Sequence, residues 1–307
     1  MTEKVNFAFI GASSKIGRSL RTLGLFDDNG AWLSRSASGA LSFEKVSSYE
    51  PDAVLAHTAE SDVLVILAAN TRDADAARLN KANVAMPTDL TSRFLDKRPD
   101  GRVIYLSSDL AAYTEIPYGA SKEAGERSLL ALGGDVICLR LSMVACLPPS
   151  AAETSLAAMA KMAGKPVVPL IGNGRFDIRP LWAGDLAAII QAFGTRRGSI
   201  EDRGCWSVFG GAVMYRDLIS KLAAHHGNQP IMAPVPILAL RLAGNALQRL
   251  NPKTGFPIDF LNAVAASPRV QPPDAFQHLG LQTTQLAQIL EWSAIFGTAH
   301  SAISPRE

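Results

Sequence analysis

Cysteine is scarce in this chain of 307 residues, and its three cysteines are scattered along the sequence. Cys138 falls in the apolar run VICLRL, which predicts a buried and reduced thiol, while Cys146 and Cys205 have no partner at ligand spacing. Neither a disulfide framework nor a zinc site is therefore expected. His225 and His226 are adjacent, and adjacent helix positions point in different directions, so we expect no metal site there.

An excess of one charge sign is also missing, because 30 lysines and arginines face 28 aspartates and glutamates. This balance gives no indication of a nucleic acid or an acidic partner. The first residues, MTEKVNFAFIGAS, lack the basic start and the cleavage site of a signal peptide, and no uncharged apolar run has membrane-spanning length. We therefore expect a cytoplasmic protein without an integral membrane segment. The segment PVPILALRLAGNALQRL predicts a buried or amphipathic helix, and a membrane-surface contact there stays an open alternative.

Apolar residues are abundant, at 48% of the chain against 19% charged residues, so a large core is expected. Several apolar runs without alternation are separated by segments of helical period: VNFAFIG, SDVLVILAAN, GRVIYLSS and DVICLRLSMV. Continuous apolar strands that alternate with helices predict an α/β fold with a parallel sheet covered on both faces. Ligands of such sheets bind beyond the carboxyl ends of the strands. Gly11 to Gly17, Ala68 to Asn70, and Ser107 with Ser108 follow strands in this way.

The pattern changes after about residue 145, where prolines become frequent and the strand–helix rhythm is lost until DLAAIIQAF and CWSVFG. We predict a dinucleotide-binding domain at residues 1–145, with return segments at about 181–210. Residues 146–180 and 211–307 would then form a smaller, irregular substrate-binding lobe.

The turn GASSKIG follows the first predicted strand. Gly11 would allow a tight turn and Gly17 a close approach of the following helix, whose N-terminus can bind a pyrophosphate. Ser14 replaces the usual middle glycine. Its side chain restricts the approach of a phosphate to the turn, but its hydroxyl could donate a hydrogen bond to that phosphate. An ordinary strand–helix turn is the alternative interpretation, but the position after the first strand favours dinucleotide binding.

The second predicted strand ends in WLSRSAS, where NAD-binding proteins tend to carry an acidic residue. Arg35 stands there instead, and a guanidinium suits a 2′-phosphate. NADP is therefore favoured slightly over NAD, and a solvated loop arginine is the alternative.

Tyr118 and Lys122 are four residues apart in IPYGASKEAGERSLL, so on a helix they lie on one side, one turn apart. Tyr-x-x-x-Lys alone occurs often by chance. Ser107 and Ser108 come one short loop earlier, and their alternative role is a cap or a turn. Together the four residues are typical of a catalytic acid–base group.

These motifs, in this order, resemble the extended short-chain dehydrogenase/reductase superfamily, and within it the NAD(P)-dependent nucleotide-sugar epimerase/dehydratase family. The resemblance rests on segments spread over about residues 5–211: GASSKIG, SDVLVILAAN, NVAMPT, VIYLSS, YGASKEAGE, LRLSMV, GNGRFDIRPLWAGDLA and CWSVFGG. It implies a Rossmann-type doubly wound sheet and a nicotinamide cofactor.

The resemblance also implies roles for individual residues. Tyr118 would be the general acid/base, and Lys122 would bind the nicotinamide ribose and lower the pKa of the tyrosine. Ser107 or Ser108 would polarise the reacting oxygen, and Asn83 would support the cofactor region. Arg175 and Arg179 could meet the diphosphate of the substrate, with solvated loop arginines as the alternative. The expected cofactor-binding set is Gly11, Ser13, Ser14, Ile16, Gly17, Arg35, Ala68, Ala69, Asn83, Tyr118 and Lys122.

The sequence departs from the family pattern at several positions. Met143 and Cys146 replace an asparagine and a glycine of the R-x-S-N-V-x-G stretch, so substrate binding should be altered. The Thr-Asp-Glu arrangement of the hexose dehydratases is missing, because Leu110 follows Asp109. Asp185 is expected as a helix N-cap.

Two classes of function are compatible with these observations. The first is an enzyme that transfers hydride at a sugar carbon, either a 4-epimerase that retains NAD or a keto-sugar reductase that consumes NADPH. The second is a non-catalytic NAD(P)-binding sensor or assembly protein with the same fold. A homodimer is possible and would follow the habit of the family.

Overall fold

The computed structural model describes residues 4–36, 41, 43–71, 75–147, 154–250 and 270–292. A seven-stranded sheet with the order β11-β6-β5-β4-β1-β2-β3 forms its centre, and all neighbouring strands are parallel. Its strands are β1 (Phe7–Ile10), β2 (Gly30–Ser34), β3 (Glu44–Lys45), β4 (Val63–Ile66), β5 (Arg102–Ser108), β6 (Asp135–Leu141) and β11 (Gly204–Val208). The predicted doubly wound, Rossmann-type sheet is thus confirmed. The strand order reverses between β1 and β4, and a crevice for a ligand opens at such a point.

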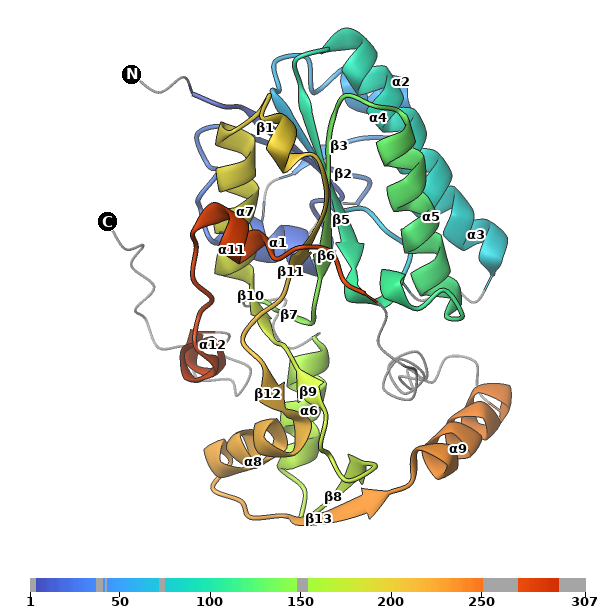
Figure 1. Ribbon diagram of the computed structural model, residues 1–307, viewed down its shortest axis with the longest axis vertical. Coiled ribbons are helices and arrows are strands. Elements are labelled where there is room, and N and C mark those ends of the chain that lie inside the picture. The colour runs from blue at the N-terminus through green and yellow to red at the C-terminus, as the bar shows by residue number, and fades with distance from the viewer. Residues whose placement is uncertain are drawn as a thin grey trace.

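Helices cover both faces of the sheet (Figure 1). On one face lie α1 (Lys15–Thr22), α7 (Ala183–Thr195) and α11 (Ala275–Leu279). On the other face lie α2 (Pro51–Leu55), α4 (Met86–Lys97) and α5 (Pro117–Ala131). The strands are buried on both sides, which explains why β1 and β4 are continuously apolar.

The long helical segment before β5 contains an irregular turn. The chain forms α3 (Ala76–Asn80), a π-helical turn at Lys81–Ala85 and then α4, in whose first turn Pro87 lies. Proline has no N–H and its ring collides with the carbonyl one turn earlier, so the chain widens before Pro87. Asn83 consequently lies inside the π-helical turn.

A second group of elements lies below the carboxyl edge of the sheet in Figure 1. It consists of β7 (Val144–Ala145), α6 (Ser155–Ala163), β8 (Val167–Ile171), β9 (Asp177–Ile178), β10 (Leu181–Trp182), β12 (Val213–Met214), α8 (Tyr215–His225), β13 (Ile231–Val235), α9 (Ile237–Leu250) and α12 (Leu286–Trp292). Three two-stranded sheets and a separate apolar core hold these elements together. They support our proposal of a substrate-binding lobe that begins near residue 145. In the described part of the chain, no helix is long and apolar enough to cross a membrane.

Two local expectations need revision. Asp185 is not the N-cap of α7, because the helix begins after Trp182. Its carboxylate instead accepts hydrogen bonds from the backbone N–H and the hydroxyl of Thr284, at 2.8 and 2.6 Å, and so fixes the C-terminal segment. Cys205 has no partner along the sequence, but it lies opposite Cys138 in the β6–β11 pair, and both residues are free thiols.

A buried arginine joins strands β5 and β6 to the end of α7. The guanidinium of Arg102 is fully buried and donates to Asp135 at 3.0 Å and to Asp202 at 3.1 Å. It also donates to the backbone carbonyl of Phe193 at 2.5 Å. The guanidinium thus supplies hydrogen bonds to two carboxylates at the amino edge of the sheet, opposite the site described below.

The substitution Arg102→Met should lower the free energy of unfolding by up to about 3–5 kcal/mol, because two buried carboxylates lose a fully buried partner. Asp202 keeps its contacts with Arg196 and His278. Asp135 keeps the N–H of Gly198. Urea denaturation measures this change. The matched control is Arg127→Met, which removes a 73%-exposed guanidinium paired with Glu123 at 3.1 Å. That change should stay within about 1 kcal/mol. Equal losses in the two variants would contradict the structural role of Arg102.

Candidate active site

The turn after β1 is built for close backbone contact. Gly11 has φ +92°, and a Cβ added there would lie 2.7 Å from the backbone nitrogen of Ala68. A Cβ on Gly17 would overlap the carbonyl of Ala12. Only glycine fits at the two positions, so the carboxyl ends of β1 and β4 and the start of α1 can meet. Ala68 is buried in this contact and Ala69 is exposed beside it.

The serines of this turn are engaged locally. Ser14 caps α1, and its hydroxyl oxygen accepts the N–H of Gly17 at 3.0 Å. Ser36, after β2, donates from its hydroxyl to that of Ser13 at 3.2 Å. The end of β2 is therefore tied to the glycine turn. The turn fits a dinucleotide, because the two glycines give it the tight geometry and α1 directs the positive end of its dipole there, while Ser14 stands where a middle glycine would admit the phosphate most closely.

Arg35 occupies the position that the sequence indicated, directly after β2. Its side chain is exposed, and its guanidinium lies 4.7 Å from the ring centroid of Tyr49. The stacking on Tyr49 holds the cation near the end of β2.

Asn83 joins three segments that surround the carboxyl edge. Its amide nitrogen donates to the backbone carbonyl of Asn70 and to the hydroxyl of Ser121, both at 2.9 Å. Its side-chain oxygen accepts the N–H of Asn70 at 2.9 Å. The residue is fully buried. It thus fixes the loop after β4 to α5, and in this structure its contacts are structural.

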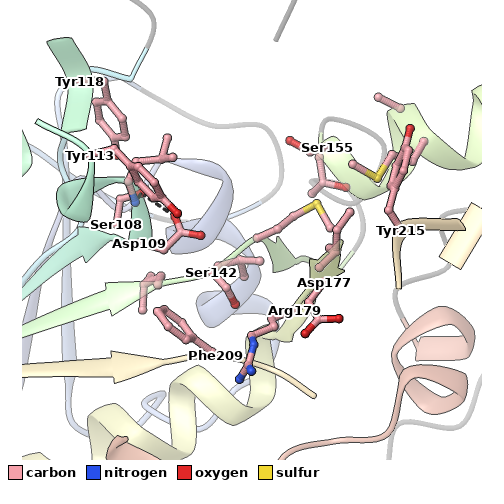
Figure 2. A pocket seen from close by; sticks show the side chains of 18 of the residues that line it. Ser108, Asp109, Tyr113, Tyr118, Ser142, Ser155, Asp177, Arg179, Phe209 and Tyr215 are labelled. Atoms are coloured by element: carbon pink, nitrogen blue, oxygen red, sulfur yellow. Dashed lines mark hydrogen bonds between the residues drawn. The ribbon is translucent and has the colours of Figure 1, made fainter. Parts of the chain in front are cut away.

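Tyr118 and Lys122 both lie on α5, which begins at Pro117. The hydroxyl of the tyrosine and the ammonium of the lysine lie in different surroundings. Tyr118 lines a cavity, as Figure 2 shows, whereas Lys122 is buried. The ammonium of Lys122 donates to the hydroxyl of Tyr105 at 2.9 Å and to the carbonyl of Leu106 at 2.7 Å. The hydroxyl of Tyr105 in turn donates to the carbonyl of Asn83 at 2.8 Å.

Burial is the main influence on the pKa values of Tyr118 and Lys122. Burial lowers the pKa of Lys122 to about 7, although the charge of Glu126 acts in the opposite direction. Burial, and then the charge of Asp109, raise the pKa of Tyr118 above its ordinary value, and a hydrogen bond with Ser108 partly offsets this. The expected lowering of the tyrosine pKa by Lys122 is not found in this arrangement, because the ammonium is bonded to Tyr105 and Leu106 instead. Tyr118 therefore holds its proton at neutral pH, which suits a proton donor.

The structure distinguishes the two serines at the end of β5. Ser107 donates to the carboxylate of Glu126 at 2.5 Å, and Arg140 forms a bidentate ion pair with that carboxylate. Ser108 donates to Asp109 at 3.1 Å and accepts the N–H of Leu110 at 3.2 Å. Both serines border the cavity, but the hydroxyl of Ser107 is committed to a buried network. Ser108 is thus the better candidate for contact with a substrate oxygen.

The cavity has a volume of about 840 Å³ and lies between the sheet edge and the lower lobe (Figure 2). Lys15 and Ile16 of the glycine turn border it on one side, next to Ser108 and Tyr118. The side formed by the lobe is mainly apolar: Met143, Met159, Met162, Pro169, Ile171, Ile178, Phe209 and Leu240. One continuous space therefore joins the glycine turn, the tyrosine and the lobe.

Of the two expected substrate arginines, only Arg179 borders the cavity. Arg175 is exposed, and its N–H is bonded to the side chain of Asn173 at 3.0 Å. The two departures from the family motif, Met143 and Cys146, also border the cavity. An altered substrate contact is thus still expected at these positions.

Three residues of this cavity, Ser142, Asp109 and Gln271, had no role assigned from the sequence. The hydroxyl of Ser142 is buried and has no hydrogen-bond partner among the described residues, so a ligand or a water in the cavity would satisfy it. Gln271 donates to the carbonyl of Asp109 at 3.3 Å and so brings the C-terminal segment to the site. Burial raises the pKa of Asp109 to about 6. Ser142 and Asp109 stood within or beside motif segments, while nothing in the sequence indicated Gln271.

Comparison with protein-family models gave no match, and comparison with curated protein sequences gave none either. Solved structures match over nearly the whole chain. UDP-N-acetylglucosamine 4-epimerase from Bacillus cereus has a TM-score of 0.70 at 14% identity, covering 98% of this chain and 99% of that one. The dTDP-4-dehydrorhamnose reductase from Bacillus anthracis, in complex with NADP, has a TM-score of 0.66 at 14% identity, covering 94% and 98%.

WbmG from Bordetella bronchiseptica, in complex with NAD and UDP, has a TM-score of 0.68 at 16% identity and covers 96% of each chain. The resemblance seen in the sequence is thus confirmed at the level of the fold, which this chain shares with nucleotide-sugar epimerases and reductases. By their titles, the reductase has NADP bound, WbmG has NAD and UDP bound, and MoeE5 is in complex with UDP-glucose and NAD.

The buried ammonium of Lys122 should make stability depend on pH. The folded pKa of about 7 lies below the ordinary value of 10.5, so between these values the unfolded chain binds a proton that the folded chain does not. Stability should therefore rise with pH across this window, by up to about 1.4 kcal/mol per pH unit relative to Lys122→Met. Urea denaturation between about pH 7 and 9.5 measures the difference, below the range in which tyrosines titrate.

The matched control for this prediction is Lys97→Met, which removes an exposed lysine at the end of α4. Its stability should follow that of the unmodified protein at every pH. Parallel curves for the unmodified protein and Lys122→Met would show that the pKa of Lys122 is not depressed.

Proposed function

We propose that the protein is an NAD(P)-dependent oxidoreductase that transfers hydride at a carbon of a nucleotide-linked sugar. The observation that carries this proposal is one cavity bordered by the glycine turn, Ser108 and Tyr118 at the carboxyl edge of a doubly wound sheet. Pockets at this edge are where ligands of such sheets bind. The similar solved structures, whose titles name epimerases and reductases, support the same class of reaction.

The nicotinamide cofactor would supply the hydride. Tyr118 holds its proton at neutral pH and would donate it to the oxygen of a keto group as the hydroxyl forms. Ser108 would hydrogen-bond the same oxygen and orient it. Lys122 would bind the ribose of the cofactor while Tyr105 and Leu106 hold its ammonium. An ammonium has three donors, and two of them are used here, so the third can meet the ribose.

Arg35 favours a reductase that uses NADPH over an epimerase that keeps NAD. Arg35 directly follows β2, and the next residue, Ser36, is hydrogen-bonded to Ser13 of the glycine turn. A 2′-phosphate bound at this end of β2 would form a charge-assisted hydrogen bond with the guanidinium. The reductase similar in fold has NADP bound. Enzymes with NAD bound have the same fold, so the preference for NADP rests on Arg35 itself.

The substrate would lie along the lobe side of the cavity. Arg179 offers a charge for a phosphate, and the unsatisfied hydroxyl of Ser142 offers a hydrogen bond to a sugar hydroxyl. Met143 provides an apolar contact where the family has an asparagine. The substrate diphosphate would therefore depend more on Arg179 than it does in the enzymes with the usual motif.

The substitution Tyr118→Phe should lower turnover of a nucleotide-linked keto sugar by about 10²- to 10⁴-fold, because the proton donor is lost. NADPH binding should change little, since the ring is retained. Stopped-flow or steady-state absorbance at the nicotinamide band measures turnover, and fluorescence titration measures binding.

Tyr49→Phe is the matched control, because it removes a tyrosine hydroxyl outside the cavity and keeps the ring beneath Arg35. It should leave turnover within about threefold of the unmodified protein. Turnover by Tyr118→Phe at the unmodified rate would rule out the assigned role. NADPH binding without turnover of any keto sugar by the unmodified protein would favour the sensor or assembly function.

A further inference from the structure

Helix α9 carries an apolar surface that no described residue covers. Leu238 and Leu242 are 68% and 63% exposed and lie four residues apart, so they share one face of the helix. Figure 1 shows α9 reaching out from the lobe beyond the end of β13. We call Leu238 and Leu242 the α9 surface.

The charges of α9 and of the chain around it have one sign. The sequence has no acidic residue between Asp217 and Asp259, a stretch that contains α9 and β13. Arg241 lies on α9 between Leu238 and Leu242 and is exposed, and Arg249 follows in the same helix. The whole chain is nearly balanced in charge, so this segment is an exception. An exposed apolar strip with cations beside it is typical of helices that lie on anionic membranes.

We propose that the α9 surface docks on an anionic lipid membrane. The leucines would enter the boundary between headgroups and acyl chains, and Arg241 would meet the lipid phosphates. This inference goes beyond the proposed reaction and does not depend on it. Leu240 of the same helix borders the cavity, so docking would bring the cavity next to the membrane.

A second copy of the chain fits the α9 surface less well. A two-fold contact places the same patch on both subunits. Arg241 would then face a patch without acidic residues in its segment, and like charges would meet. A lipid surface with anionic headgroups complements both the apolar strip and its cations.

Sedimentation with sucrose-loaded vesicles tests the proposal. The full chain should bind vesicles of equal parts phosphatidylglycerol and phosphatidylcholine at least about tenfold more tightly than vesicles of phosphatidylcholine alone. Added salt should weaken this binding. The double substitution Leu238→Asp/Leu242→Asp should reduce binding to the anionic vesicles by about tenfold or more.

Ile200→Asp is the matched control, because Ile200 is 74% exposed in a short helix before β11, outside the α9 surface. It should bind the vesicles as the unmodified protein does. Retained NADPH binding and an unchanged circular dichroism spectrum would show that the double variant is folded.

Three results would overturn the proposal. They are no binding of the full chain to anionic vesicles, equal binding by the double variant, and loss of self-association by the double variant without any vesicle binding. The last result would assign the surface to a second copy. Vesicle binding is measured without substrate, so a failure of the proposed reaction leaves this test intact.

Discussion

The buried ammonium of Lys122 is the constraint around which the carboxyl edge of the sheet is organised. It binds Tyr105 and the carbonyl of Leu106 on β5, and Tyr105 continues the network to the π-helical turn through the carbonyl of Asn83. Desolvation of the charge is costly, so α5 must lie where these oxygens can solvate it. That position presents Tyr118, one turn earlier, to the cavity. The same burial that lowers the pKa of Lys122 therefore also fixes the position of the candidate proton donor.

The sequence predicted the parts of the fold that depend on local residue types. Gly11 and Gly17 stood in the turn where any Cβ would collide with backbone, and continuous apolar runs marked strands buried on both faces. Tyr118 and Lys122 were correctly placed on one helix. Their chemistry was less accessible, because the pKa of each group depends mainly on burial, which the packing of the whole sheet edge decides. Asp109 and burial act on Tyr118, and Glu126 acts on Lys122.

The features that the sequence did not predict arise from contacts over long distances along the chain. Asp185 looked like a cap because an acidic residue often precedes a helix, yet its partner is Thr284. Gln271 reaches Asp109, a residue far earlier in the chain. Ser142 differs from other serines only in having a buried and unsatisfied hydroxyl. Neither residue spacing nor helix propensity encodes such contacts, since they depend on how the lobe packs against the sheet.

The identity of the bound nucleotide tests the central claim, a nicotinamide site at the glycine turn beside Tyr118, most directly. The purified protein is denatured, any released nucleotide is identified by mass spectrometry, and the emptied protein is titrated with NADPH and NADH by fluorescence. We expect the emptied protein to bind NADPH more tightly than NADH, as Arg35 at the end of β2 requires. Retained NAD(H) would instead favour an epimerase and contradict the role of Arg35. Binding of neither nucleotide would contradict the claim itself.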